Sequence, residues 1–337
     1  MKAPDFWYPA RPRFSLQRTL LAPAAALYEA GATRKLRKAT PYKPGVPVIC
    51  IGNATVGGVG KTPAAAAIAR LLTKAGEPPH ILMRGYGGRL NGPVQVNLDK
   101  HRAKDVGDEA LLLAREAPVW IARDRAKGAK AATKSGARVI LMDDGFQNPS
   151  VEKTFSLLLI DSELGFGNGA IFPAGPLRER PEAAIARADA VVFVKRDLPT
   201  PIRKDLFALG FGKMPRLQAW LEPQTAPEGR VVAFSGIGRP QKFFDMLGGL
   251  GLDVAATKSF PDHHPFTKKD IKSLHAAAKK HQARLITTDK DLVRLSQRDR
   301  QNIDTLPVAM AFDQTDRLSE MLCIAIERAR HDKRIGP

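Results

Sequence analysis

The sequence predicts an α/β fold in which a parallel sheet is covered by helices and is followed by a second, smaller α/β domain. Short apolar runs alternate with helix-prone stretches along the 337-residue chain, a pattern typical of strand–helix–strand units. A glycine-rich loop joins the first apolar run to the first helix-prone stretch. A shorter alternation of the same kind begins after a proline-rich segment at 199–227.

The first strand is predicted at 46–51, and the loop that follows it can hold a phosphate. An alanine-rich, helix-prone stretch comes next, at 64–72. A helix N-terminus leaves backbone N–H groups unpaired and carries the positive end of the helix dipole, so a loop leading into it favours anions. We therefore predict a P-loop NTPase domain, in a variant form because Thr55 stands where the strict pattern has glycine. The residues expected to bind the nucleotide are Thr55, Val56, Gly57, Gly58, Val59, Gly60, Lys61 and Thr62.

Several polar residues are candidates for binding the terminal phosphates and a magnesium ion. Lys61 would reach the phosphates, and the Thr62 hydroxyl would ligate Mg²⁺. Asp143 and Asp144 follow the apolar run 138–142, at the sheet edge where α/β proteins bind ligands. A carboxylate there holds Mg²⁺ directly or through water, although one of the two can instead cap the turn. Glu179, in a stretch rich in glycine and proline, is a further candidate metal ligand.

The remaining elements follow from the same alternation of apolar runs and helix-prone stretches. In the first domain, further strands are predicted at 80–83, 119–122, 138–142, 157–160 and 190–194, with helices at 108–116 and 124–134. In the second, a strand from 230, a helix at 240–247 and strands at 252–257 and 284–288 precede a terminal helix at 319–330. The expected organisation is a membrane-association segment (1–40), a P-loop domain (41–215), a smaller domain (216–315) and a C-terminal helix (316–337), which can pack back on the P-loop domain.

Composition indicates which classes of partner to expect and which cysteine-based sites to exclude. The chain has 53 Lys and Arg against 34 Asp and Glu, a net charge of +19, so anionic partners are expected. Zinc-finger spacing, an aromatic RNA-binding signature and a heptad-backed basic region are all missing, so nucleic acid is not predicted. Cys50 and Cys323 lie far apart, which argues against a disulfide framework or a zinc site. Nothing in the sequence indicates an obligate protein partner.

The N-terminal segment suits a membrane surface. Apolar and aromatic residues between Trp7 and Tyr28 alternate with Arg11, Arg13 and Arg18, and a basic run follows at 34–38. An apolar face with an aromatic and cationic rim fits the headgroup region of an anionic membrane. The longest apolar stretch, 20–28, is far shorter than the roughly 20 residues of a spanning helix. We predict an amphipathic helix that lies on a membrane; the alternative is a helix whose apolar face packs on its own domain.

Further candidates for chemistry are harder to judge from the residues alone. Asp108 precedes a predicted helix and can simply be its N-cap. His263 and His264 lie in the second domain. A lone histidine pair of this kind is more often structural than catalytic. Arg84, Arg125 and Arg178 can neutralise charge on a phosphate. Arg84 and Arg178 have glycine and proline neighbours, which can hold the backbone in one conformation. A guanidinium that must be held in one position needs such a backbone. Arg125 has no such neighbours and is the weakest candidate.

Taken together, the ordered motifs resemble the tetraacyldisaccharide 4′-kinase family, the lipid A 4′-kinases of Gram-negative bacteria. The resemblance extends from the N-terminal segment to about residue 291. The motifs that carry it lie at 52–63, 84–87, 107–109, 143–147, 167–179, 234–238 and 260–263.

The resemblance implies an activity and a location. The family transfers the γ-phosphate of ATP to the 4′-hydroxyl of a tetraacylated glucosamine disaccharide 1-phosphate, forming lipid IVA in lipopolysaccharide biosynthesis. ATP and Mg²⁺ are the expected cofactors, and the acylated disaccharide lipid and an anionic membrane surface the expected partners. The expected location is the cytoplasmic face of the bacterial inner membrane, in peripheral attachment.

The resemblance also assigns roles to residues. Asp108 and His263 match the positions of the family's catalytic dyad, which overrides the N-cap interpretation of Asp108. Lys61 and Arg178 complete the predicted catalytic set by stabilising charge on the phosphoryl oxygens. Because the dyad residues lie in different domains, the smaller domain is expected to close over the nucleotide.

Two other classes of function compete with this one. A membrane-associated regulatory ATPase or GTPase switch has a similar loop, but its signature lysine is replaced here by Val56, and 287–291 only loosely resembles a guanine-specificity motif. A non-catalytic nucleotide-binding protein would leave Asp108 and His263 without a role. The sequence therefore favours the kinase.

Overall fold

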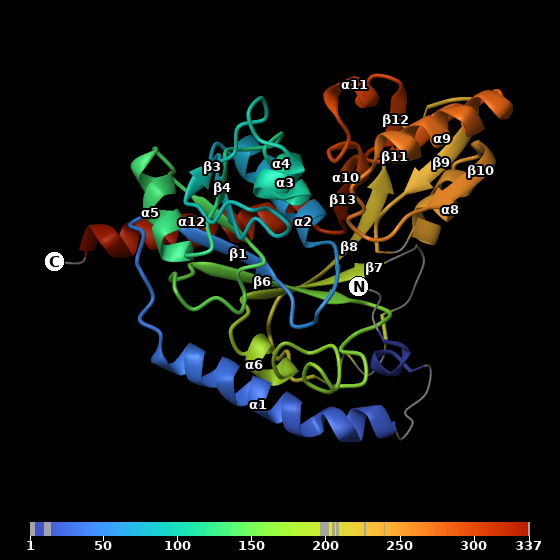
Figure 1. Cartoon of the computed structure of the whole chain (residues 1–337). Coiled ribbons are helices and arrows are strands. Elements are labelled where there is room, and N and C mark those ends of the chain that lie inside the picture. Colours follow the sequence, from blue (N-terminus) through green and yellow to red (C-terminus); the bar gives the residue numbers. More distant parts are fainter. Residues whose placement is uncertain are drawn as a thin grey trace.

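The computed structural model describes residues 4–9, 15–195, 202–203, 206, 209–225, 227–238 and 240–335. Its strands form a nine-stranded sheet in a large domain and a four-stranded sheet in a small domain. In Figure 1 the small domain lies at the upper right of the large one, and helix α1 (Leu16–Lys38) runs along the lower edge of the molecule. The expected α/β class is confirmed. Arg11, Arg13 and Phe14 of the N-terminal segment lie outside the described residues.

The large sheet is built around β1 (Val48–Gly52), which pairs in parallel with β5 and β6. Every residue of β1 is buried, as expected of a strand covered on both faces. The sheet order is β13-β8-β7-β6-β1-β5-β2-β4-β3. Its outermost strands, β3 and β13, are antiparallel to their neighbours. The other strands of this sheet are β2 (His80–Met83), β3 (Val94–Gln95), β4 (Val119–Ile121), β5 (Ile140–Asp143), β6 (Phe155–Asp161), β7 (Ala190–Lys195), β8 (Arg216–Pro223) and β13 (Val308–Phe312).

Helices cover both faces of the large sheet, and each face has its own apolar core. On one face, α2 (Lys61–Lys74), α3 (Ala103–Val106), α4 (Asp108–Leu113) and α12 (Thr315–Ile335) pack over alternate residues of β1. On the other, α1, α5 (Arg125–Lys134) and α6 (Pro181–Ile185) pack over the remaining ones. This division follows from the period of two along a strand, which sends successive side chains to opposite faces.

The small domain repeats this arrangement on a smaller scale. Its four strands, all parallel, have the order β10-β9-β11-β12. One face packs on α8 (Pro240–Gly249) and the other on α9 (Lys268–Lys280). Two short helices, α10 (Asp289–Leu292) and α11 (Gln297–Arg300), connect β11 to β12. The strands are β9 (Arg230–Ser235), β10 (Asp253–Ser259), β11 (Arg284–Thr288) and β12 (Ile303–Leu306).

The expected boundaries of the smaller domain, 216 and 315, need correction. Strands β8 and β13 fall inside that range, yet β8 pairs with β7 and β13 pairs with β8 in the large sheet. The chain therefore leaves the large domain after β8 and returns to it at β13. Composition does not reveal this, because the pairing joins segments far apart in sequence. The C-terminal helix α12 does pack on the large domain, where Leu318, Leu322 and Ile326 are fully buried.

Helix α1 has two distinct faces. Its inner face buries Ala25, and Leu21 packs against the core of the large domain. Its outer face carries Leu16, Leu20 and Leu27, whose exposed fractions are 64%, 71% and 76%. The spacing of these leucines places them on one side of the helix. Across the described residues, no helix combines the length and the apolar character that crossing a bilayer requires.

The packing of α12 yields a prediction about stability. Leu322→Ala should lower the free energy of unfolding by about 2–5 kcal/mol, because it leaves a cavity in the core. Urea unfolding measures this effect. Ile324, on the same helix, is 38% exposed, and Ile324→Ala should change the free energy by no more than about 0.5 kcal/mol. Equal effects of the two changes would contradict the packing described here.

Candidate active site

The glycine-rich loop between β1 and α2 has the backbone geometry of a phosphate cradle. Helix α2 begins at Lys61, and its N-cap, Gly60, has φ +89°. Gly57 has φ +122°, so both positions favour glycine over residues with a side chain. Lys61 Nζ donates to Asn53 Oδ1 at 3.0 Å and to Gly57 O at 3.3 Å. The lysine is thereby folded back over the loop whose N–H groups would face a phosphate.

A second loop lies directly against the first. Val56 N donates to Pro176 O at 2.6 Å, and Arg178 N donates to Ala54 O at 2.7 Å. Thr55 and Leu177 form an isolated antiparallel bridge. The glycine- and proline-rich stretch singled out in the sequence is therefore the second wall of the phosphate site, and it carries Arg178 into that site.

The two consecutive carboxylates behave differently. Asp143, the last residue of β5, is 3% exposed, and its Oδ1 has no hydrogen-bond partner. Burial raises its pKa to about 7. Asp144 has φ +50° and accepts a hydrogen bond from Arg178 Nη1 at 2.8 Å, with Lys61 Nζ at 3.7 Å. Asp144 thus holds the two cations in place, while Asp143 is the carboxylate with a free oxygen.

The donor set fits a magnesium ion that is bound mainly by phosphates. Mg²⁺ in nucleotide sites takes one or two protein ligands, and phosphate oxygens and water complete its shell. Asp143, with its orphaned oxygen, and the buried Thr62 at the start of α2 would supply such ligands. Within the described part of the chain, no group of three or more His, Cys, Asp or Glu residues is arranged to hold a metal by itself.

Glu179, also predicted as a metal ligand, has protein partners on both carboxylate oxygens. Its Oε1 accepts a hydrogen bond from Gln147 Nε2 at 2.8 Å, and its Oε2 pairs with Arg187. Gln147 Nε2 also donates to Asn53 O at 2.8 Å. Both oxygens are therefore used in bracing the residues behind the phosphate loop, a role that sequence neighbours do not reveal.

The three arginine candidates differ in how deeply their side chains are buried. Arg178 is half-buried and engaged with Asp144, and Arg84 is exposed. Arg125, which had the least support in the sequence, is only 4% exposed. Its Nη1 donates to Ala122 O, but its Nε has no partner. Burial lowers the pKa of Arg125 to about 10, and an orphaned buried guanidinium N–H is a group that an anionic ligand would satisfy.

The structure brings Asp108 and His263 together across the domain boundary. Asp108 is the first residue of α4, is 4% exposed, and lies with its Oδ2 at 3.2 Å from His263 Nδ1. The N-cap of α4 is Gly107, so the capping interpretation of Asp108 is wrong. His263 has φ +57°, a strained conformation for a residue with a side chain and one often found at functional sites.

Charge and burial set the protonation of this pair. Burial alone would raise the pKa of Asp108, but the hydrogen bond with His263 and the charge of Arg294 outweigh it and hold the pKa far below its usual value. The hydrogen bond to Asp108 raises the pKa of His263 against the opposing effect of burial. The pair therefore combines an ionised carboxylate with an imidazole of increased basicity.

His264 has a different environment. Its Nε2 lies 3.0 Å from Asp270 Oδ2, in the capping box of α9, and its ring stacks on Phe260 at 4.9 Å. These contacts fix the loop that carries His263. The structure thus gives the two neighbouring histidines different environments, a distinction that the residues alone did not provide.

Sequence reasoning missed several residues at this site. Asn53 and Gln147 brace the phosphate loop, and both fall inside motifs that the sequence had singled out. Lys290 Nζ pairs with Glu109 Oε1 at 2.6 Å, and Arg294 pairs with Asp108. Lys290 lies in 287–291, where the only signal was its weak likeness to a guanine-specificity motif.

Comparisons with known proteins find relatives over nearly the whole chain. Residues 17–327 match the family model described as tetraacyldisaccharide-1-P 4′-kinase. Tetraacyldisaccharide 4′-kinase of Paramagnetospirillum magneticum is 50% identical over 328 residues, covering 95% of this chain and 98% of that protein. The enzyme of the same description from Rhodospirillum centenum is 47% identical over 331 residues, covering 96% of each.

A solved structure shares the fold. The crystal structure of the "apo" form of LpxK from Aquifex aeolicus in complex with ATP aligns with a TM-score of 0.74 at 28% identity. The alignment covers 92% of this chain and 100% of that chain.

Asp143 and Glu179 can be told apart as metal ligands by magnesium-dependent nucleotide binding. Asp143→Asn should weaken ATP binding in the presence of Mg²⁺ by about tenfold or more, because it removes a metal ligand, and should leave binding in EDTA unchanged. Calorimetry with and without Mg²⁺ measures both quantities. Glu179→Gln is the matched control and should keep the magnesium dependence of the parent. The same loss in both variants would instead support Glu179 as a second carboxylate ligand.

Proposed function

The chain belongs to the tetraacyldisaccharide-1-P 4′-kinase family, and from this premise we propose how its residues carry out the reaction. The reaction transfers the γ-phosphate of ATP to the 4′-hydroxyl of a tetraacylated glucosamine disaccharide 1-phosphate and forms lipid IVA, a lipid A precursor. ATP and Mg²⁺ are its cofactors. The family match leaves the regulatory switch without support. The observation that carries the proposed mechanism is the contact between Asp108 and His263 at 3.2 Å.

The pair lies beside the phosphate site. Glu109, the neighbour of Asp108, is close enough to Asp143 for its charge to add to the rise in the pKa of Asp143. The acceptor hydroxyl bound against His263 would therefore be near the phosphate held by the loop. The closing of the smaller domain over the nucleotide stays a prediction.

His263 is the better proton acceptor of the two. The Asp108 carboxylate already accepts hydrogen bonds from Glu109 N, Arg294 and His263, and a carboxylate with so low a pKa is a weak base. In the proposed mechanism, His263 Nδ1–H donates to Asp108, and Nε2 takes the proton of the 4′-hydroxyl as that oxygen attacks the γ-phosphorus and the bond from phosphorus to the leaving ADP oxygen breaks. Asp108 then stabilises the imidazolium.

The cations of the phosphate site stabilise charge on the transferred group. Lys61 lies over the loop and Arg178 enters from the second loop, and both are oriented by Asp144. Arg125 offers its orphaned N–H to an anionic oxygen. Mg²⁺, when bound, would neutralise charge on the β- and γ-phosphates.

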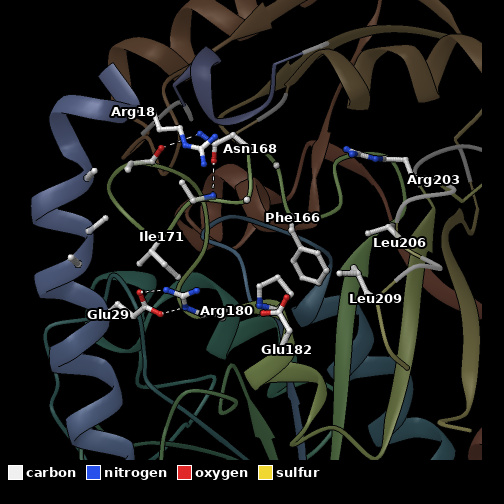
Figure 2. Close-up of a pocket in the computed structure, with 18 residues that line it drawn as sticks. Arg18, Glu29, Phe166, Asn168, Ile171, Arg180, Glu182, Arg203, Leu206 and Leu209 are labelled. Carbon is white, nitrogen blue, oxygen red and sulfur yellow. Dashed lines mark hydrogen bonds and ion pairs between the residues drawn. The ribbon is translucent and has the colours of Figure 1, made fainter. Parts of the chain in front are cut away.

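A cavity between α1 and the segment 166–182 is suited to the acylated substrate. It has a volume of about 700 Å³ and, as Figure 2 shows, α1 forms one wall while Leu206 and Leu209 lie on the opposite side with Phe166 between them. Arg180 and Glu29 point toward one another at its edge. Ile171 and Ala174 line the cavity a few residues before Arg178. We place part of the lipid here, with its sugar toward the phosphate site.

The outer face of α1 extends this apolar surface toward a membrane. Three exposed leucines, Leu16, Leu20 and Leu27, occupy that face, and a basic run at 34–38 ends the helix. Apolar side chains buried in the headgroup region and cations beside anionic lipids would attach the protein peripherally. We propose attachment at the cytoplasmic face of the inner membrane, where ATP is available.

The mechanism predicts which residues are required for transfer. Asp108→Asn and His263→Gln should each reduce transfer of labelled γ-phosphate from ATP to detergent-dispersed lipid substrate by about a hundredfold or more, with ATP binding unchanged. His264→Gln is the matched control and should keep most of the activity, because His264 contacts Asp270 and not Asp108. Free phosphate released equally by the parent and by Asp108→Asn, with no label in the lipid, would overturn the kinase.

Membrane attachment can be tested separately. Leu16→Ser, Leu20→Ser and Leu27→Ser together should weaken binding to vesicles of anionic phospholipid by about tenfold or more, because each exposed leucine loses apolar contact. Sedimentation with vesicles measures this. Leu98 and Leu250 are also exposed but lie on other parts of the chain, so Leu98→Ser with Leu250→Ser should leave binding unchanged. If the α1 variant binds as well as the parent, α1 is not the membrane contact.

A further inference from the structure

Arg294 is a buried arginine that connects the small domain to the catalytic carboxylate. It follows α10 and its side chain is 6% exposed. Its Nε donates to Asp108 Oδ2 at 3.0 Å, and its Nη2 donates to the same oxygen. Two donors of one planar guanidinium thus hold the carboxylate of the large domain in a fixed orientation.

The other side of the guanidinium is anchored in the small domain. Arg294 Nη1 donates to Asp291 Oδ1 at 2.9 Å and to Gly236 O at 2.7 Å. Asp291 is fully buried, and its Oδ2 accepts from Ser235, Gly236 N and Thr288 at the ends of β9 and β11. The arginine is therefore fixed to the carboxyl edge of the small sheet.

The same anchor fixes the histidine. Gly236 O accepts a second hydrogen bond, from His263 N at 3.0 Å. One carbonyl therefore orients both the guanidinium that holds Asp108 and the strained backbone of His263. A Cβ at Gly236 would lie 3.2 Å from both Asp291 Oδ1 and Pro261 O, so the chain passes close to both partners at this point.

We infer that Arg294 is a positioning residue of the dyad: anchored on Asp291 and Gly236, it holds the Asp108 carboxylate against the His263 imidazole across the domain boundary. This inference rests on the proposed role of the dyad. Every nitrogen of Arg294 is directed to Asp108, Asp291 or Gly236, and Nη2 also lies 3.3 Å from His263 Nδ1.

The charges around His263 give the inference a measurable consequence. The groups that face this imidazole are Asp108 and Asp262, which raise its pKa, and Arg294, which lowers it, with the Tyr86 ring centroid 6.0 Å away. Removing Arg294 while keeping Asp108 therefore raises the pKa of His263 further. Because Nε2 must be unprotonated to accept the hydroxyl proton, activity then rises at a higher pH than in the parent.

Arg294→Met tests both consequences by steady-state kinetics over a range of pH. We expect kcat to fall by about tenfold or more, because the carboxylate loses its orientation, with KM for ATP within about twofold of the parent. The rising limb of the pH profile should move to higher pH. Arg294→Lys keeps the positive charge. The rising limb of its pH profile should therefore match that of the parent, and its kcat should be partly restored.

Arg300→Met is the matched control. Arg300 also lies in the small domain and donates to Val293 O and Leu295 O, on either side of Arg294, but not to Asp108. It should leave kcat and the pH profile unchanged. Equal loss of activity in Arg294→Met, Arg294→Lys and Arg300→Met at every pH would reduce Arg294 to a structural residue and overturn the inference.

The inference can also be tested without turnover. An NMR titration of His263, assigned by loss of its signal in His263→Gln among the seven histidines of the chain, should give a higher pKa in Arg294→Met than in the parent. An unchanged pKa would overturn the inference even if the enzyme is active. A parent enzyme that transfers no phosphate to lipid, with the shifted pKa present, would instead contradict the proposed function and leave the contact intact.

Discussion

The parallel pairing of β1 with β5 is the constraint on which the rest of the site depends. Ile51, near the end of β1, is in register with Asp143 at the end of β5. Because the carboxyl ends of parallel strands meet at one edge of a sheet, the phosphate loop and the carboxylate come together with no further adjustment. The loop that carries Arg178 then completes the site by pairing with residues directly after β1.

Charge compensation organises the site at this edge. Lys61 and Arg178 share Asp144, while Asp143 and Arg125 keep buried polar atoms without protein partners. Buried polar groups of this kind are costly unless a ligand satisfies them. A bound magnesium nucleotide would supply a cation to Asp143 and anionic oxygens to Arg125. The unpartnered atoms thus support the proposed ligand, and the paired groups hold the site in shape.

The small domain contributes chemistry as well as shape. His263, Lys290 and Arg294 all come from this domain, and they contact the consecutive residues Asp108 and Glu109 of the large one. Two acidic residues at the start of α4 therefore receive three basic partners across the boundary. The contact between Asp108 and His263 exists only when the two domains are together, so the proposed chemical step depends on their relative position.

The sequence by itself determined the features that are local. The strand, glycine-rich loop and helix that form the candidate phosphate site are adjacent in the chain, and Asp143 lies at the end of its strand, so periodicity and turn chemistry were enough. Asp108 and His263 came from the family resemblance and not from the residues, since no local rule joins positions in two domains.

Only the tertiary structure decided the features that depend on distant segments. Four features involve partners from other elements of the chain. They are the return of β13 to the large sheet, the burial of Arg125, the pairing of Glu179 with Arg187 and the pairing of Arg294 with Asp108. A local pattern reports which face of a strand or helix is apolar. It carries no information on which polar group from another element will satisfy a buried charge, because that is fixed by packing between elements.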